Sequence, residues 1–343
     1  MTAPCRLDFP RDHAAHPDYR TEWWYYTGNL KAETGERYGF QLTFFRMRTT
    51  PAAGTASRPD KSSAWRTNQV FAAHLALSDL QSGRFFHSEK MSRAALDLAG
   101  THEDKGGFIV FVNDWSASIA REGGRLTAGT ADFSIQLDLL TRKAPVLHGD
   151  SGYSRKGESP EEASCYYSVT RLEAAGTVSV GGRELKVRGT AWMDHEFSSA
   201  PLNANLAGWD WFSLQFSDGS DLMIYLMREK NGEWSPVSSG TYVYPDGKSI
   251  RLSSNDFRVK ALNGWKSPHS GAVYPSSWSL EIPPVGLRAN IRPNLADQEM
   301  QSPESTRVTY WEGSVRVEGT AGQAPVQGEG YVELTGYAGP VQF

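Results

Sequence analysis

The sequence predicts an all-β fold built from antiparallel strands. Apolar and polar residues alternate over short runs, and a period of two is the pattern of a strand with one buried face. Glycine-containing turn dipeptides separate these runs at short intervals, as hairpins require. No stretch keeps a period of 3.6 residues for three helical turns. The most helix-like segment, residues 91–98, is short.

The strands and turns can be followed along the chain in order. Alternation is clearest at residues 38–45, 107–112, 133–139, 177–187, 222–227 and 314–318. Turns are expected at Thr34-Gly35, Ser82-Gly83, Gly106-Gly107, Gly123-Gly124, Gly181-Gly182, Asp218-Gly219 and Asp246-Gly247. Residues 50–66 are rich in structure breakers, and this loop is either a plain connector or a lid over an opening.

A weak internal repeat predicts two similar units. The segment WWYYTGNLKAETGERYGFQLTFFR, residues 23–46, can be laid on WDWFSLQFSDGSDLMIYLMR, residues 209–228. Each begins with an aromatic strand, turns at a glycine and returns through an apolar strand that ends in arginine. The return strands are apolar on both faces, so each must be covered on both, either by packing between barrels or by a filled barrel interior. The polar stretch at residues 197–208 is the expected boundary.

Composition excludes several classes of protein. The 343 residues carry a net charge of −4 and no basic run, so nucleic-acid binding is not expected. No window holds 18 uncharged apolar residues, which argues against a transmembrane segment. The first residues show no signal-peptide pattern, so we expect a periplasmic or secreted protein if a leader has been removed, and otherwise a cytoplasmic one. Cys5 and Cys165 are too few for a disulfide framework and are expected to be unbridged.

Aromatic residues are unusually frequent and gather near the start of the chain. The sequence holds 11 Trp, 14 Tyr and 15 Phe, and residues 22–30 read EWWYYTGNL. These rings either fill a core or line a pocket, and alternation lets only one of each neighbouring pair face a lumen. If Glu22 is buried among them, its pKa should be raised. In a simpler arrangement, Arg46, Arg171 and Arg228 neutralise the buried carboxylates.

The segment GTAWMDHEFSS holds the densest group of titratable residues, Asp194, His195 and Glu196. Such a group offers a general acid or base with partners that tune its pKa. In a strand, Asp194 and Glu196 share one face while His195 points to the other. The group is therefore either catalytic or a hydrogen-bonded structural corner. No second histidine lies at a ligand spacing from His195, so no metal site is expected.

A resemblance to serine proteases does not survive inspection. Gly149-Asp150-Ser151-Gly152 and Ala72-Ala73-His74 look like the serine and histidine segments of chymotrypsin-type enzymes. However, Tyr153 replaces a small glycine. In addition, the chain between His74 and Ser151 is too short to place them in successive barrels.

Seven regions of the chain resemble a known family. They are EWWYYTGNL (22–30), FAAHLALSD (71–79), HGDSGYSRKG (148–157), CYYSVTRL (165–172), GTAWMDHEFSS (189–199), GWDWFSLQFSDGSDLMIYLMR (208–228), and YWEGSVRVEG with GYVELTGY near the end. They resemble the carotenoid 1,2-hydratase (hydroxyneurosporene synthase) and AttH-like family. The chain is more similar to the AttH-like branch, often labelled secreted hydrolases, than to the carotenoid enzymes.

The resemblance implies a fold and a type of chemistry. The fold would be two lipocalin-like antiparallel β-barrels or curved sheets packed together, residues 1–200 and 201–343. In the hydratases a buried acid protonates an isoprenoid double bond and water captures the cation. This implies a cofactor-free lyase or isomerase that acts on a hydrophobic small molecule. A non-enzymatic lipid carrier is the alternative, and a cofactor-free hydrolase comes third.

The expected site residues follow from this resemblance and from the clusters above. Asp194 and His195 are the expected proton-handling residues, with Glu22 as the reserve acid. The expected substrate-binding residues are Trp23, Trp24, Tyr25, His74, Tyr167, Arg171, Trp192, Trp209 and Trp211. No cofactor or metal is expected.

Overall fold

The structure is a computed structural model that describes residues 5–49, 67–104, 106–200 and 203–341. Its first sheet contains β1 (Thr21–Ala32), β2 (Arg37–Arg48), β3 (Gln69–Asp79), β4 (Arg84–Arg93), β5 (Ala99–Asp104), β6 (Gly107–Val112), β7 (Trp115–Ala120), β8 (Gly123–Gly129), β9 (Phe133–Thr141), β10 (Val146–Leu147), β11 (Tyr153–Arg155), β12 (Ala163–Val180) and β13 (Arg183–Ser198). A short 3-10 helix, η1 (Arg11–His13), precedes it.

The second sheet contains β14 (Leu206–Phe216), β15 (Asp221–Glu229), β16 (Ser239–Val243), β17 (Ser249–Ser253), β18 (Arg258–Lys266), β19 (Val273–Ile282), β20 (Leu287–Pro293), β21 (Glu299–Gln301), β22 (Thr309–Ala321) and β23 (Ala324–Leu334). A second 3-10 helix, η2 (Pro283–Val285), joins β19 to β20. All strand pairs are antiparallel, so the predicted all-β class is confirmed.

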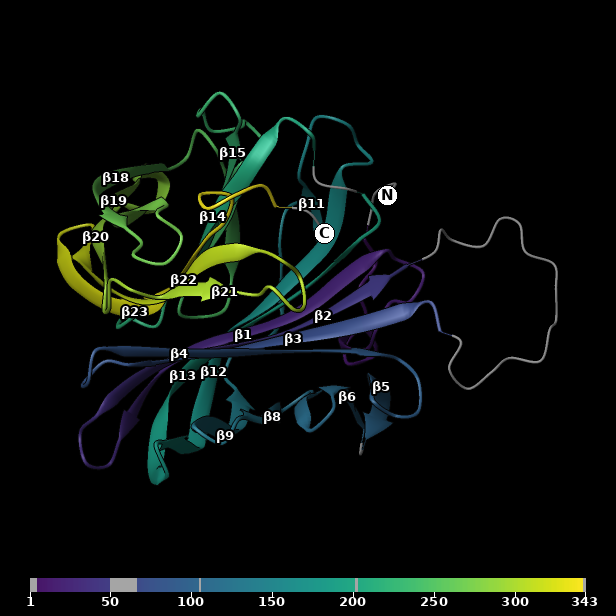
Figure 1. Ribbon diagram of the computed structural model, residues 1–343. Coiled ribbons are helices and arrows are strands. Elements are labelled where there is room, and N and C mark those ends of the chain that lie inside the picture. Colours follow the sequence, from purple (N-terminus) through teal and green to yellow (C-terminus); the bar gives the residue numbers. More distant parts are fainter. Residues whose placement is uncertain (1–4, 50–66, 105, 201–202, 342–343) are drawn as a thin grey trace.

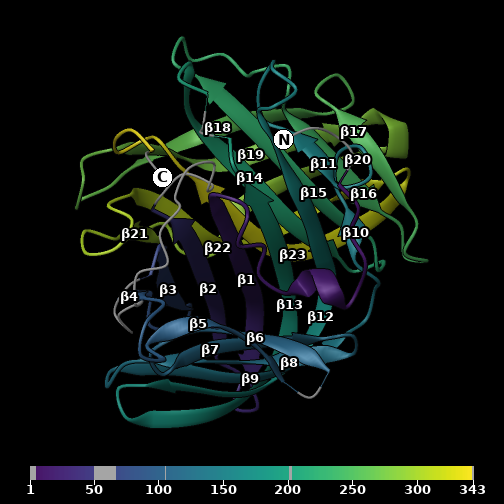
Figure 2. The same ribbon diagram turned by 90° about the vertical axis from the view of Figure 1, so that its right-hand side faces the viewer.

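Both sheets follow the same strand order. The first runs β4-β3-β2-β1-β13-β12-β9-β8-β7-β6-β5, and the second runs β17-β16-β15-β14-β23-β22-β20-β19-β18. The hairpins β1–β2 and β14–β15 occupy matching positions, next to the last two strands of their own sheets. The hairpin repeat predicted from the sequence is therefore present. Each sheet curls, and Figure 2 shows β5–β9 folded beneath β1, β12 and β13.

The two sheets pack face to face through these central strands. Contacts join β1 to β23, β2 to β22, and β12 to both β14 and β15, and Figure 1 shows the second sheet lying against β1, β2 and β3. A Cβ at Gly39 of β2 would lie 2.6 Å from the Cβ of Ser314, so a glycine is needed for this close approach. As expected, β2 and β15 are buried on both faces along most of their length.

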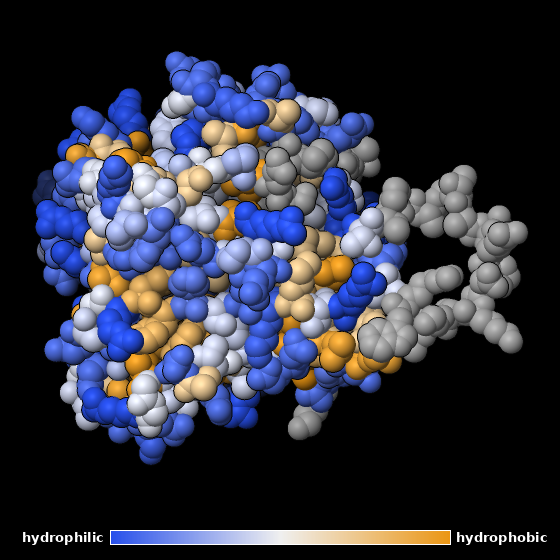
Figure 3. All heavy atoms as spheres, viewed as in Figure 1, coloured by the Kyte–Doolittle hydropathy of each residue, from blue (hydrophilic) through white to orange (hydrophobic). Residues whose placement is uncertain are grey.

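The chain passes from the first sheet to the second after β13, which ends at Ser198, and before β14, which begins at Leu206. The proposed lid or connector, residues 50–66, lies outside the described residues. On the face shown in Figure 3, most of the surface is hydrophilic and the apolar residues form small separate areas. Among the described residues, no helix has the length and apolar character that crossing a membrane would require.

Residues 91–98, the most helix-like segment of the sequence, are not helical, in keeping with the predicted all-β class. Their first residues complete β4, and Leu96 and Asp97 then adopt positive φ angles of 54° and 55°, which end the strand in a left-handed turn. The expectation for the two cysteines was wrong, because Cys5 and Cys165 form a disulfide with a Cα–Cα distance of 5.7 Å. Their separation of 160 residues hides this proximity in the sequence, and the bond ties the N-terminal segment to β12.

Candidate functional site

Alternation along β1, β12 and β13 sends neighbouring residues to opposite faces of the first sheet. Side chains on one face meet the second sheet and surround a cavity of about 170 Å³, here called the inter-sheet pocket. Its aromatic lining consists of Trp23, Tyr25, Phe45, Tyr166, Trp209, Trp211, Tyr225 and Tyr310. Side chains on the other face point into the curl of the first sheet and form what we call the inner cluster, namely His13, His16, Glu22, Arg46, Tyr167 and His195.

Asp194 is the buried acid of the inter-sheet pocket, with 4% of its surface exposed. The Trp192 indole donates a hydrogen bond to Asp194 Oδ1 at 2.5 Å, the Ser168 hydroxyl donates to the same oxygen, and the Tyr166 hydroxyl donates to Oδ2. Burial raises the pKa of Asp194 to about 7, although these three hydrogen bonds act in the opposite direction. The carboxyl group can therefore hold a proton near neutral pH.

The second sheet supplies further carboxyl groups. Burial raises the pKa of Glu333, which lines the pocket, to about 7, and the Trp209 indole donates to its Oε2 at 2.6 Å. Burial and the nearby Glu333 hold the pKa of Glu312 well above its usual range, and Glu312 accepts a 2.6 Å hydrogen bond from the Tyr25 hydroxyl. The pocket thus combines protonatable acids with aromatic walls.

One cation also borders the pocket. Lys156 Nζ lies 3.0 Å from Glu196 Oε1, and it sits 4.1 Å from the centre of the Tyr225 ring and 4.9 Å from that of Tyr166. Burial alone would lower the pKa of Lys156, but Glu196 and the other nearby acidic groups raise it. Lys156 therefore pairs with Glu196, and Asp194 and Glu333 are the pocket-lining carboxyl groups whose pKa burial raises to about 7.

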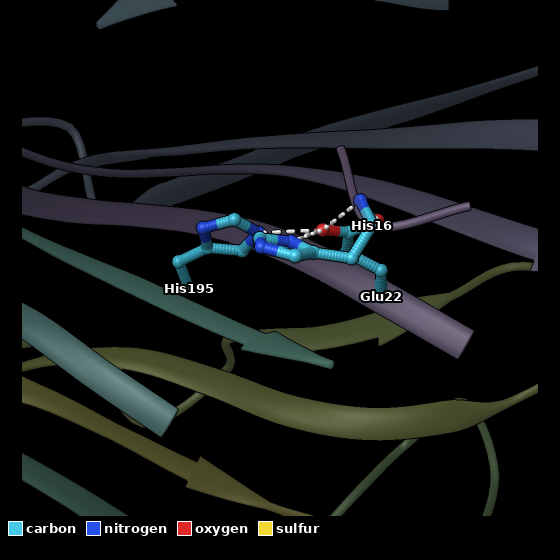
Figure 4. A group of neighbouring side chains, drawn as sticks. All are labelled: His16, Glu22 and His195. Carbon is cyan, nitrogen blue, oxygen red and sulfur yellow. Dashed lines mark hydrogen bonds and ion pairs between the residues drawn. The ribbon is translucent and has the colours of Figure 1, made fainter. Parts of the chain in front are cut away.

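In the inner cluster, the pKa of Glu22 is shifted in the opposite direction from the one expected. Glu22 Oε1 lies 2.8 Å from both His16 Nδ1 and His195 Nε2, as Figure 4 shows, and Arg46 Nε donates to Oε2 at 2.7 Å. Burial would raise the pKa of Glu22, but the hydrogen bonds from the two histidines and the charge of Arg46 hold it well below its usual range. The expected raised pKa was wrong, because three donors converge on this carboxylate.

The same three residues have the composition of a metal site. Ligand atoms of His16, Glu22 and His195 lie within 4.8 Å of one another. However, both imidazoles hydrogen-bond to the carboxylate, and the Arg46 guanidinium already supplies it with a positive charge. An added cation would have to displace these contacts and lie beside Arg46. The donor set therefore fits a self-contained hydrogen-bond network better than a metal centre.

The structure divides the expected site residues between the two faces. Asp194, Trp23, Tyr25, His74, Trp209 and Trp211 line the inter-sheet pocket. Trp192 stands behind that pocket as a donor to Asp194. Glu22, Trp24, Tyr167 and His195 belong to the inner face instead, where Trp24 stacks on His195 with ring centres 4.8 Å apart.

The three arginines take the simpler arrangement. Arg171 binds Asp221 at 2.6 Å and Arg228 binds Asp210 at 2.7 Å, while Arg46 binds Glu22. Arg171 thus connects the two sheets and does not line the inter-sheet pocket. Asp221 and Asp210 are buried acids that need such partners, because an unpaired buried charge is costly.

The aromatic stretch at residues 22–30 serves both of its expected roles. Trp24 and Tyr26 pack in the core of the first sheet, whereas Trp23 and Tyr25 line the inter-sheet pocket. The sequence argument missed Tyr166 and selected its neighbour Tyr167. The choice depends on the register of β12 with β13, which pairs Tyr166 with Glu196 and Tyr167 with His195. No local signal marks Glu333, because its position depends on how the sheets pack.

His74 and Ser151, the residues that resemble those of serine proteases, do not form a catalytic pair. His74 Nδ1 lies 2.8 Å from the Tyr310 hydroxyl, and its Nε2 lies 2.8 Å from the Ser305 hydroxyl, so neither ring nitrogen is left for Ser151. Ser151 sits in an exposed turn with a φ of 52°.

Comparison with known proteins agrees with the fold. The chain matches a kievitone hydratase of Fusarium solani subsp. phaseoli at 26% identity over 214 residues, 59% of this chain and 56% of that protein. It thus spans a little over half the length of this curated relative. The crystal structure of kievitone hydratase from Nectria haematococca has a TM-score of 0.72 at 15% identity, over 97% of this chain and 93% of that one, and shows the fold alone.

A further solved structure is more similar. A crystal structure from Nitrosomonas europaea assigned to AttH superposes with a TM-score of 0.86 at 34% identity, over 98% of this chain and 99% of that chain. A family model described as AttH-like matches residues 1–337. Because that match covers almost the whole sequence, this chain belongs to the AttH-like family.

Proposed function

We propose that this protein hydrates a carbon–carbon double bond of an apolar, unsaturated small molecule in the inter-sheet pocket. The observation that carries the proposal is Asp194, a buried carboxyl group whose pKa is raised to about 7 by burial, among aromatic rings. An acid of this pKa is protonated in a useful fraction at neutral pH and can donate to a weakly basic carbon. The similarity to kievitone hydratase supports the same type of reaction.

The chemistry needs one proton and one water molecule. Protonated Asp194 transfers its proton to one alkene carbon, which leaves a cation at the other. Water then forms a bond to the cation and loses a proton to a carboxylate, either Asp194 itself or Glu333. Trp23 and Trp211 line the pocket, and an aromatic ring stabilises a cation that lies over its face. The net reaction adds one water molecule and needs no cofactor.

The size of the pocket limits what it can enclose. A volume of about 170 Å³ is close to that of a cavity which holds a single benzene ring, so the pocket encloses the reacting end of a larger molecule. The rest of the substrate would extend past Thr21 and Thr306, which also line the opening. Isomerisation or cyclisation would use the same proton donor and differ only in the fate of the cation.

A lipid carrier without catalytic activity is the alternative. A carrier needs an apolar lining and gains nothing from buried acids, which are costly to desolvate. The presence of Asp194 and Glu333, two buried carboxyl groups with raised pKa values, in one pocket favours the enzyme.

A hydrolase would need an activated nucleophile. The Ser168 hydroxyl lies 2.6 Å from His148 Nε2, but it donates to Asp194 and does not line the pocket. The Ser305 hydroxyl, which lies 2.8 Å from His74 Nε2, donates to Glu89.

The test begins with the substrate. The purified protein is extracted with organic solvent, any retained lipid is identified by mass spectrometry, and that lipid is incubated with enzyme in ¹⁸O-labelled water. Wild type should form a product heavier by one labelled water. Asp194→Asn should slow turnover roughly 10²- to 10⁴-fold with little loss of binding. Turnover that survived Asp194→Asn undiminished would refute Asp194 as the acid. Binding without turnover by wild type would favour the carrier.

A further inference from the structure

We propose that the first sheet holds a second binding site, separate from the inter-sheet pocket, for a neutral and largely apolar small molecule with one hydrogen-bond-accepting oxygen. The Tyr26 hydroxyl is the donor that recognises this oxygen. The proposal concerns the opposite face of β1 from Tyr25 and does not depend on the hydratase reaction.

A cavity of about 650 Å³ opens inside the curl of the first sheet. The turn between β7 and β8, the end of β9 with the residues that follow it, the N-terminal segment and the middle of β12 enclose it. None of its lining residues lines the inter-sheet pocket. Its volume lies within the range of roughly 300 to 1,000 Å³ that is usual for small-molecule sites.

The Tyr26 hydroxyl is the first sign of a missing ligand. Tyr26 lines the cavity and is 1% exposed, and its oxygen has no hydrogen-bond partner among the residues that the structure describes. A buried hydroxyl without a partner costs about 1 to 3 kcal/mol. Burial raises the pKa of Tyr26 above its usual value, so the phenol stays protonated and remains a donor. A ligand oxygen would satisfy it.

The second polar group in the cavity, His13, makes a charged ligand unfavourable. His13 Nδ1 lies 2.6 Å from the Tyr167 hydroxyl, which contacts His195 Nδ1 at 2.9 Å and so connects His13 to Glu22 through the inner cluster. Burial and the nearby His195 lower the pKa of His13 to about 3, so its ring is neutral at physiological pH. The buried part of the cavity therefore offers polar groups without charge.

The remaining lining matches an apolar body. Ile119, Leu139, Val169 and Leu172 contribute side chains, and Phe9 covers them from the N-terminal segment. The register of β12 shifts between Val169 and Leu172, and such bulges are common beside binding sites because they re-aim side chains.

Charged side chains lie at the rim and do not reach the enclosed part of the cavity. Arg121, Glu122 and Arg142 are exposed, and Arg142 already binds Glu173. Lys143 is bound to Asp221 at 2.7 Å. With the unpartnered Tyr26 hydroxyl inside and the charges outside, the cavity fits a neutral molecule with a single carbonyl or ether oxygen.

Benzophenone is a suitable probe, because it is neutral, apolar and has one carbonyl oxygen, and because light attaches it covalently to nearby side chains. After irradiation, peptide mass spectrometry should find it on residues 118–124 and 139–145. Tyr26→Phe removes only the unpartnered hydroxyl and should raise the concentration for half-maximal labelling of these peptides roughly 2- to 12-fold. Ala144→Trp, at an exposed lining position, should block the labelling.

Tyr38→Phe is the matched control, because Tyr38 is buried in the same sheet but does not line the cavity. It should leave labelling unchanged, and thermal melting of each variant checks that the fold is intact. Labelling that avoids both peptide regions, or that Tyr26→Phe leaves unchanged, would overturn the proposal. The measurement needs no turnover, so a protein without hydratase activity would still test this site.

Discussion

At the scale of single residues, the proposed chemistry depends on opposing influences on Asp194. Burial favours the protonated acid, whereas the donors from Ser168, Tyr166 and Trp192 favour the carboxylate. Without the donors the acid would hold its proton too tightly to give it up, and without burial it would be ionised at neutral pH. Glu22 shows the opposite result, because an arginine and two imidazoles outweigh burial there.

The pH dependence of turnover follows from this balance. Asp194 must be protonated to act, and its pKa is raised to about 7, so kcat should be constant at lower pH and fall about tenfold per pH unit above 7. Steady-state rates between pH 5.5 and 9 measure this. A rate that rose through this range would mean that the essential group acts as a base.

Removal of one donor should shift that profile. The Tyr166 hydroxyl lowers the pKa of Asp194, so Tyr166→Phe should raise it and move the falling limb to higher pH. We expect kcat to change by less than about tenfold, because the acid itself remains. An unchanged midpoint would show that Tyr166 does not tune Asp194.

At the scale of single strands, alternation gives neighbouring residues separate functions. Asp194 and His195 are adjacent in β13 but face the pocket and the inner cluster respectively. His195→Gln should therefore lower the free energy of unfolding by roughly 1 to 3 kcal/mol while folded enzyme keeps its kcat. Urea unfolding and kinetics on the same samples check this. Loss of kcat without loss of stability would return His195 to the catalytic group.

The limits of the sequence argument are visible in the same strands. Period-two parity correctly separated Asp194 from His195, and the repeat predicted the paired hairpins. Alternation shows which residues share a face of the sheet, but it cannot show which face meets the second sheet. For this reason Trp24 and Tyr167 were wrongly assigned to the pocket. That choice depends on long-range pairings such as Tyr25 with Asp194 across β1 and β13. The position of Glu333 beside the pocket could not be predicted, because Glu333 lies in the second sheet and its position depends on how the two sheets pack.

At the scale of the whole molecule, the disulfide connects the N-terminal segment to β12. Cys5 lies shortly before His13 and His16, so the bond helps to hold the inner cluster in place. The double variant Cys5→Ser with Cys165→Ser should lose roughly 2 to 4 kcal/mol of unfolding free energy. A reductant should destabilise wild type equally and leave the variant unaffected. Equal stability of wild type with and without reductant would contradict this role.

The disulfide is also informative about the cellular compartment in which the protein works. Such bonds persist in oxidising compartments, so its presence supports our proposal that the protein works in the periplasm or outside the cell. Fractionation of the native host, with an antibody against this chain, would test the proposal. Recovery in the cytoplasmic fraction alone would refute it.

Acid should act on the fold in two opposing ways. Burial lowers the pKa of His13, His74 and His148 to about 3, whereas an unfolded histidine titrates near 6.5, so each histidine costs roughly 1.4 kcal/mol of stability per pH unit below 6.5. Asp194 and Glu333, whose pKa burial raises to about 7, oppose this loss, because the folded protein binds their protons at a higher pH than the unfolded chain does. Urea midpoints of wild type and His74→Gln at pH 7, 6 and 5 isolate one histidine: the variant should lose less stability toward pH 5, and parallel curves would contradict this.

The most direct test of the central claim is the pKa of Asp194 in the free protein. Carboxyl ¹³C chemical shifts of aspartate-labelled protein, followed from pH 4 to 9, would report it, with Asp194→Asn used to assign the signal. We predict a midpoint about 7, as required of an acid that donates a proton at neutral pH. A midpoint about 4, near the ordinary value for aspartate, would contradict the proposed mechanism.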